Sequence, residues 1–287
     1  MCRCISVTHQ ADSERHCAVS ATGGDKRIFN MRIILTNNHL AQFGGTESWT
    51  LTMARELIRQ GHDVGVFTHH KGVVSNLLKD NLDDNPQDYD LALINHNSCR
   101  HIKAKKRIFT SHGWVPELEH PPAGMDVYVV VSENVSKKWD IPLIIKNPVD
   151  TELYKPIHPI AETPIQRLAI TSHPLNMNCF YPTRVEETMP QLMQKADLVI
   201  TAGRGVLEAM STARNVVVYD QRPGLGMCAD GYLQLPITGN VGGEYKLKTI
   251  NLDVEIAKYK QEHGERNRDY ILEHHDVKKI VEQYFNL

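Results

Sequence analysis

The chain alternates short, uninterrupted apolar runs with longer segments in which apolar residues recur every three or four positions, beginning at Met31. Uninterrupted runs of Val, Ile and Leu are typical of strands that are buried on both faces of a parallel sheet. Such runs predict strands at residues 32–36, 64–68, 91–95, 107–111, 127–132, 143–146, 167–172, 197–201 and 216–220.

The segment between the first two runs predicts a helix. Its predicted apolar face consists of Trp49, Met53, Leu57 and Ile58. Thr46 is a residue type that caps helix N-termini, and Gly61 suits the position just past the C-terminus. Strand, helix and strand together predict a βαβ unit, and therefore a parallel sheet with right-handed crossovers.

Further helices are predicted at 185–196, at 203–210 and from about Leu252 onward. Pro190 should start or kink its helix, because proline lacks the N–H group that a helix interior needs. Four prolines in residues 147–166 favour a linker.

These elements predict an α/β fold of two Rossmann-like domains whose parallel sheets face a cleft. The first domain would cover residues 31–150, and a shorter second domain would cover 151–287 with terminal helices. Residues 1–30 are polar, lack clear periodicity and lack the apolar core of a signal peptide, so a flexible extension is expected there.

Composition narrows the class of protein. The 287 residues are 41% hydrophobic and 23% charged with a formal net charge of -2, which gives no electrostatic reason to bind nucleic acid. The basic run at 101–107 is too short to change this expectation. No apolar stretch approaches the ~20 residues that span a bilayer. Six scattered cysteines without a CxxC pair indicate a reducing, cytoplasmic compartment.

The segment FGGTES follows the first predicted strand, where ligands of open parallel sheets bind. Gly44 and Gly45 remove the Cβ atoms that would keep a ligand from the backbone. The helix that follows directs N–H groups there, which favours anionic or hydroxyl-rich ligands. A tight turn explains the two glycines as well, and their spacing fits neither a dinucleotide fingerprint nor a P-loop.

His112 and Gly113 lie at the end of another predicted strand, in the segment FTSHGWVPE. A neutral histidine there can bond a sugar hydroxyl, and Trp114 offers an apolar face to a ring. Taken alone, His112 is better explained as a histidine that satisfies a nearby backbone group.

A second glycine-rich turn lies within residues 196–220. Gly203 and Gly205 flank Arg204, whose guanidinium suits phosphate oxygens. Glu208 is in the first turn of the predicted helix, where its carboxylate can accept two hydroxyl donors of a ribose. A structural helix terminus with a dipole-stabilising glutamate is the alternative. The convergence of glycines, arginine and glutamate favours a functional role.

The sequence gives little support for a metal site or for a catalytic nucleophile. The histidines and cysteine in 96–101, and the histidine pairs at 69–70 and 274–275, lack a partner pair at zinc-site spacing. No Ser-His-Asp or Cys-His arrangement is readable, and Cys228 lacks the context of a nucleophile elbow.

Three ordered segments carry a resemblance to a known family: residues 31–68 with their G-G-x-E loop, 129–156 with N-x-V-D-x-x-x-[FY]-x-P, and 196–220 with an E-A-M core. They resemble the retaining GT-B glycosyltransferases of family 4, the group 1 type. The resemblance implies His112 and Glu208 as catalytic residues, the first near the transferred sugar and the second on the nucleotide ribose. It assigns donor binding to matched positions Gly44, Gly45, Thr46, Glu47, Asn147, Gly203, Arg204, Gly205 and Val206.

The resemblance also implies the reaction. The donor would be a UDP- or GDP-sugar and the acceptor a hydroxyl group of a glycan or small molecule. Transfer would proceed with retention, without a metal or other cofactor and without an enzyme nucleophile. Backbone amides, a helix end and arginine would stabilise the leaving diphosphate.

The chain departs from the family pattern at several positions. Ile200 stands where the first glutamate of E-x7-E belongs, and the R-x-x-x-x-K clamp is missing after the first strand of domain two. Arg184 or Arg204 is a candidate for the missing charge. These departures leave two alternatives: a non-catalytic GT-B-like binding or partner subunit, and a sugar-nucleotide epimerase of the same architecture.

Overall fold

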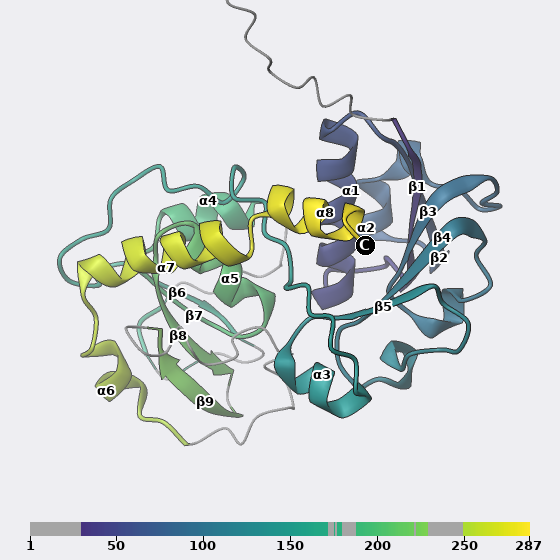
Figure 1. Ribbon diagram of the computed structural model, residues 1–287. Coiled ribbons are helices and arrows are strands. Elements are labelled where there is room, and N and C mark those ends of the chain that lie inside the picture. The colour runs from purple at the N-terminus through teal and green to yellow at the C-terminus, as the bar shows by residue number, and fades with distance from the viewer. Residues whose placement is uncertain (1–29, 172–174, 176, 180–187, 221, 229–248) are drawn as a thin grey trace, which may run out of the picture.

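The computed structural model contains two β-sheets, each accompanied by helices, joined by a segment that follows β5 (Val127–Val130) (Figure 1). The residues that the structure describes are 30–171, 175, 177–179, 188–220, 222–228 and 249–287. The expected extension at 1–30 lies almost wholly outside them. Within the described residues, no helix combines the length and apolar character that crossing a bilayer would need.

The first sheet has the strand order β2-β1-β3-β4-β5, and all of its pairs are parallel. With β5, its strands are β1 (Arg32–His39), β2 (Asp63–His70), β3 (Tyr89–Ile94) and β4 (Ala104–Ser111). The predicted apolar runs are therefore strands, and they bury side chains on both faces because two separate clusters, one containing Ile33 and one containing Ile34, pack on opposite sides.

Helix α1 (Gly45–Arg59) connects β1 to β2 and buries the predicted apolar face except for Ile58, which is 40% exposed. Gly61 follows the helix with a φ of +85°, as expected for a glycine past a C-terminus. The predicted cap Thr46 is wrong: Gly44 occupies the N-cap position, and Thr46 lies in the first turn. Its carbonyl accepts a hydrogen bond from the Thr50 hydroxyl instead.

The run at 143–146 does not form the predicted strand. It makes an isolated parallel bridge between Ile144 and Val130 beside β5. The two prolines that bracket this segment, Pro142 and Pro148, carry no N–H and so limit the ladder. The remaining elements of this half are α2 (Val73–Asn76), α3 (Glu133–Trp139) and 3₁₀ turns at Lys79–Asn81, Asn97–Cys99 and Glu117–Glu119.

The second sheet has the order β6-β7-β8-β9. Its predicted strands are β6 (Arg167–Ile170), β7 (Leu198–Thr201) and β8 (Asn215–Asp220), which are parallel. The antiparallel β9 (Arg222–Met227) was not predicted, because one proline and two glycines interrupt its apolar pattern.

Helices α4 (Met189–Gln194) and α5 (Arg204–Ser211) accompany this sheet. Pro190 lies in the first turn of α4, as predicted. The predicted helix positions 185–187 lie outside the described residues.

The C-terminal part is helical, with α6 (Leu252–Ile256), α7 (Gln261–His274) and α8 (Val277–Phe285). Figure 1 shows α8 beside α1, on the first sheet's side of the molecule. Ile280 and Tyr284 belong to the first sheet's core, and the Tyr284 hydroxyl lies 2.9 Å from the Thr110 hydroxyl. The last helix, counted with the second domain in the sequence, therefore packs on the first.

Candidate active site

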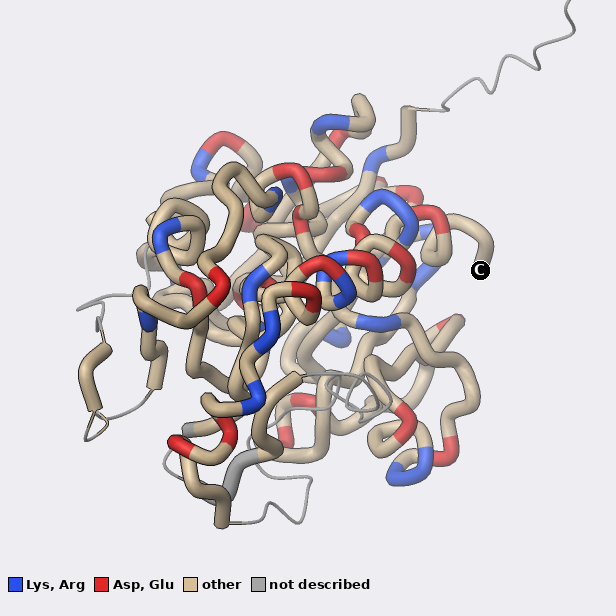
Figure 2. Tube along the Cα trace, turned by 90° about the vertical axis from the view of Figure 1, so that its left-hand side faces the viewer, with Lys and Arg blue, Asp and Glu red and all other residues tan. Residues whose placement is uncertain are grey.

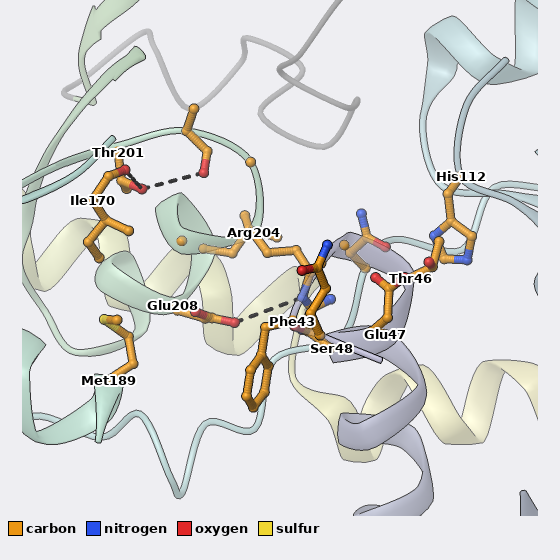
Figure 3. Close-up of a pocket in the computed structure, with 18 of the residues that line it drawn as sticks. Phe43, Thr46, Glu47, Ser48, His112, Ile170, Met189, Thr201, Arg204 and Glu208 are labelled. Carbon is orange, nitrogen blue, oxygen red and sulfur yellow. Dashed lines mark hydrogen bonds and ion pairs between the residues drawn. The ribbon is translucent and has the colours of Figure 1, made fainter. Parts of the chain in front are cut away.

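A cavity of about 520 Å³ lies between the two halves, at the ends of β1, β4 and β7 (Figure 3). Both glycine-led helix starts, at Gly45 and Gly205, contribute to its wall. The predicted site residues that line it are Gly44, Gly45, Thr46, Glu47, His112, Asn147, Gly203, Arg204, Gly205 and Glu208. The residues were selected because ligands of parallel sheets bind beyond the carboxyl ends of the strands, and those selected in both halves of the chain line the same cavity.

Val206 is the predicted site residue that does not line the cavity. Its side chain is fully buried in the core beneath α5. Its backbone N–H donates to the carbonyl of Gly203 at 3.2 Å. Val206 is not among the residues that line the cavity, so its contact with the donor stays a prediction.

The two adjacent glycines have different structural reasons. A Cβ atom on Gly44 would lie 2.3 Å from Oε2 of Glu47. The Glu47 carboxylate can therefore lie against the start of α1 only because residue 44 is a glycine. A Cβ atom on Gly45 would meet nothing within 4 Å. Only Gly45 therefore leaves open space toward the cavity.

Glu47 is occupied by a partner that the sequence did not single out. Its Oε1 lies 2.7 Å from Nδ1 of His39, and the carboxylate is almost fully buried. Burial raises the pKa of Glu47, while hydrogen bonds from its own backbone N–H and from Thr46, together with His39, oppose the rise. The helix start thus carries a histidine–carboxylate pair on the cavity wall.

His112 is held by neighbouring amides. Its Nε2 lies 3.1 Å from Oδ1 of Asn95, and its ring also bonds the side chain of Asn147. Asn95 in turn donates to the Thr50 hydroxyl at 3.1 Å. Burial, with His96 and Arg204 nearby, lowers the pKa of His112 to about 3. At neutral pH it is an uncharged hydrogen-bonding group.

The other wall of the cavity is the start of α5. Gly203 turns the chain with a φ of +63°, which favours glycine. A Cβ atom on Gly205 would lie 2.7 Å from the Thr201 hydroxyl, so the close approach of α5 to β7 requires a glycine. These two positions set the direction of the Arg204 side chain, which points toward the first half of the molecule (Figure 3).

Arg204 and Glu208 form a buried pair. Nε of Arg204 lies 3.8 Å from Oε1 of Glu208, and Nη2 donates to the carbonyl of Pro148 at 2.9 Å. Within the described part of the chain, Nε and Nη1 are buried without a hydrogen-bond partner. Burial lowers the pKa of Arg204 and raises that of Glu208, and the attraction between them opposes both shifts. The Tyr154 hydroxyl also bonds the Glu208 carboxylate.

The rest of the second half offers an apolar surface to the cavity, formed by Ile170, Met189, Met193 and Leu207. Ile200 is fully buried in the core, so no carboxylate replaces the first glutamate of the family pattern. Arg184, the other candidate for the missing charge, lies outside the described residues.

Two lining residues, His39 and His96, were missed in the sequence. The first predicted strand stopped at Thr36, whereas β1 continues to His39. If the predicted strand had been extended through the polar residues that follow Thr36, His39 would have been placed at the carboxyl end of a strand, where His112 was also placed. His96 was weighed only as a metal ligand. The described residues hold no group of three or more His, Cys, Asp or Glu side chains arranged for a metal ion.

Charge is mixed on the side of the molecule shown in Figure 2, where basic and acidic positions of the described trace alternate. A footprint for a polyanion would need basic positions gathered on one face or along one helix.

Comparison with known proteins identifies the fold. No family model matches the chain, and no curated protein matches its sequence. Among solved structures it is similar to a glycosyltransferase from Rickettsia africae ESF-5, with a TM-score of 0.60 and 12% identity over 90% of this chain and 97% of that one. It is also similar to an alpha-glucosyltransferase in complex with UDP and a 13-mer DNA containing a HMU base, with a TM-score of 0.54 and 12% identity over 90% and 99% of the two chains.

A third similar structure is the glycotransferase of kitacinnamycin, with a TM-score of 0.50 and 12% identity over 89% of this chain and 98% of that one. At such identities the likeness concerns the fold. The predicted α/β fold of the GT-B type, with two Rossmann-like units facing a cleft, is confirmed.

Proposed function

We propose that this protein transfers a sugar from a nucleoside diphosphate sugar to a hydroxyl acceptor. The observation that carries the proposal is the buried Arg204–Glu208 pair at a glycine-led helix start, across one cavity from a second glycine-led helix start. The fold supports it, since the similar structures are of glycosyltransferases and one of them contains UDP.

The donor's nucleotide fits the second half of the cavity. Glu208 is a carboxylate that can accept hydrogen bonds from two ribose hydroxyls, and its bond from Tyr154 holds it in place. The apolar side chains of Ile170, Met189 and Leu207 offer a surface to the flat base. The donor is therefore expected to be a UDP- or GDP-sugar, with the base toward α4 and α5.

The diphosphate fits beside Arg204. Nε of this guanidinium faces the Glu208 carboxylate, whereas Nη1 has no hydrogen-bond partner among the described residues. A buried donor left unpaired costs about 1–3 kcal/mol, which a bond to a phosphate oxygen would recover. The N-terminus of α5 adds the positive end of its dipole. Arg204 thus substitutes for the absent R-x-x-x-x-K clamp.

The transfer itself is expected to need no metal and to retain the configuration of the anomeric carbon. Arg204 and the helix end would stabilise the charge on the leaving diphosphate. Neutral His112 would hold a hydroxyl of the transferred sugar, and no side chain is needed as a nucleophile. Cys99 and Cys228, which are buried and form no disulfide, and a donor of this kind fit a cytoplasmic enzyme.

A thermal-shift screen against nucleoside diphosphates and their sugars tests the proposal. At least one UDP- or GDP-sugar should raise the melting temperature, with or without EDTA, and Glu208→Ala should abolish the rise. Absence of any shift and of any turnover would refute the proposal.

Two further outcomes separate the alternatives. Binding without consumption of the sugar nucleotide would indicate a non-catalytic binding subunit. Inversion of a ring carbon without an acceptor, followed by NMR, would indicate an epimerase.

A further inference from the structure

Two histidines lie together on the first half's side of the cavity. His39 ends β1, and His96 follows the neighbouring strand β3. Both line the cavity, and their ring centroids are 6.0 Å apart. The proposed binding of the nucleotide and sugar uses neither of them.

The hydrogen position on His39 is set by its partner. Nδ1 lies 2.7 Å from Oε1 of Glu47, and a carboxylate can only accept, so Nδ1 carries the hydrogen. In the neutral ring, Nε2 is then a lone-pair acceptor. The side chain is 40% exposed although Glu47 is only 4% exposed, so the end of the ring away from Glu47 is open.

His96 has the opposite arrangement. Its Nδ1 lies 3.0 Å from the backbone nitrogen of Asn38, which donates to it, so Nδ1 is the lone-pair atom and Nε2 carries the hydrogen. Burial, with His39 nearby, lowers the pKa of His96 to about 4, so the ring stays neutral near pH 7. In the described part of the chain, no acceptor bonds its Nε2–H.

The pair therefore presents one acceptor, on His39, and one donor, on His96. A hydroxyl group both donates and accepts, so two neighbouring hydroxyl groups of one molecule can satisfy both nitrogens. Carboxylates and the dianions of phosphate monoesters cannot donate to His39, and ammonium groups cannot accept from His96. The pattern selects hydroxyl groups over charged ones.

The surrounding charges agree with this selection. Among the described lining residues of the first half, the charged side chains other than histidine are the carboxylates of Glu47 and Glu119. The one arginine, Arg204, belongs to the opposite wall. Phe43 and Leu118 add apolar surface on which the face of a sugar ring can lie.

We infer that His39 and His96 form the acceptor subsite and that they bind two neighbouring hydroxyl groups of an uncharged sugar or polyol. The inference rests on the proposed function, since the acceptor is the second substrate of that transfer. Glu47 acts through His39, because its bond with Nδ1 selects the tautomer of the neutral ring in which Nε2 is the acceptor.

Saturation-transfer NMR with the full chain tests the inference. The neutral probes are methyl α-D-glucopyranoside and methyl α-D-mannopyranoside, and the anionic probe is gluconate. Wild type should bind at least one methyl glycoside and not gluconate. His39→Gln and His96→Gln should each weaken that binding about tenfold, the equivalent of one hydrogen bond.

His70→Gln is the matched control, because His70 is the register partner of His39 on β2 and its side chain is not part of the cavity wall. It should bind the probe as wild type does. Calorimetry with UDP and GDP on the same proteins separates the two proposals. If the glutamine variants lose sugar binding but keep the affinity of wild type for UDP and GDP, the subsite is supported. If wild type itself binds neither nucleotide, the proposed function alone is refuted.

A direct readout of the hydrogen positions comes from ¹⁵N-histidine NMR. His39 should give the Nδ1–H form and His96 the Nε2–H form. The inference is overturned if both rings have the same form, if gluconate binds as well as the methyl glycosides, if wild type binds neither glycoside, or if both glutamine variants bind like wild type.

Discussion

Nε of Arg204 lies 3.8 Å from Oε1 of Glu208, one turn further along α5, and both side chains are almost wholly buried. The same guanidinium reaches the other half of the molecule, because its Nη2 donates to the carbonyl of Pro148 at 2.9 Å and lies 3.4 Å from the Thr52 hydroxyl on α1. A positive charge held at this low-dielectric boundary acts strongly on an anionic ligand in the cavity.

Glu208→Gln keeps the shape of the side chain and removes its charge. We expect nucleoside diphosphate affinity to fall about tenfold, since the amide cannot accept two ribose hydroxyls with both of its polar atoms. Arg204 would lose its buried counter-charge, so the free energy of unfolding should also fall by about 3 kcal/mol. Calorimetry and urea denaturation measure the two effects. Glu265→Gln, on the exposed face of α7, should change neither.

Arg204→Gln should weaken binding in proportion to the phosphates on the ligand. Loss of a charged hydrogen bond to phosphate costs about 2 kcal/mol, and this applies to the diphosphate and not to the bare nucleoside. The measurement is the ratio of dissociation constants for uridine and UDP, or guanosine and GDP. Wild type and the exposed control Arg100→Gln should share a large ratio. An unchanged ratio in Arg204→Gln would contradict a diphosphate contact.

Gly44→Ala should disturb the fold at the start of α1. The new methyl group would lie 2.3 Å from Oε2 of Glu47, so the carboxylate must move and its pair with His39 is lost. We expect a loss of about 1–3 kcal/mol in the free energy of unfolding. Thermal denaturation checks this, and a variant as stable as wild type would contradict the packing described.

Gly45→Ala is the matched comparison. Its methyl group would meet no atom within 4 Å, so stability should be unchanged or slightly higher. The methyl group would instead occupy space in the cavity, and binding of the donor should weaken. A variant that binds donor as wild type does would show that the open backbone at Gly45 serves only the turn.

His275 makes stability depend on pH. It is fully buried, its Nδ1 donates to the carbonyl of Asn147 at 2.7 Å, and its Nε2 has no hydrogen-bond partner among the residues that the structure describes. Burial lowers its pKa from the ordinary 6.5 to about 3. The unfolded chain therefore binds the proton first as pH falls, so the stabilising contribution is complete above about pH 6.5 and is lost progressively toward pH 3.

The comparison variant is His275→Asn, which keeps a donor and cannot titrate in this range. Below about pH 6.5, wild type should lose stability relative to the variant by about 1.4 kcal/mol per pH unit. Urea denaturation at pH 7.5, 6 and 5 measures the difference. Parallel curves for the two proteins would contradict a neutral, buried His275.

The elements that the sequence predicted best are those whose local pattern and tertiary environment agree. All predicted apolar runs except 143–146 became parallel strands. Arg204, Gly205 and Glu208 lie close together because the eight-residue helix α5 carries all three, with Gly203 as its N-cap. Val206, two positions after Arg204, is buried in the core and does not line the cavity, because residues two apart on a helix point in nearly opposite directions.

What the sequence could not predict depends on contacts between distant residues. The docking of α8 on α1 joins residues that are far apart in the chain, such as Trp49 and Tyr284, whose ring centroids are 5.9 Å apart. The pairing of His39 with Glu47 depends on how far β1 extends and on the fold of the loop after it. Strand ends are set by hydrogen-bonding partners, which a single sequence does not contain.

The central claim is that the protein cleaves the bond between the sugar and the diphosphate of a nucleoside diphosphate sugar bound in this cavity. ³¹P NMR of the full chain with a panel of UDP- and GDP-sugars, in EDTA and with methyl glycosides as acceptors, tests it most directly. The account predicts that for one donor the sugar-nucleotide signals give way to those of the free nucleoside diphosphate, and that Arg204→Gln slows this conversion. Donors that all remain intact, or that release a nucleoside monophosphate instead, would contradict it.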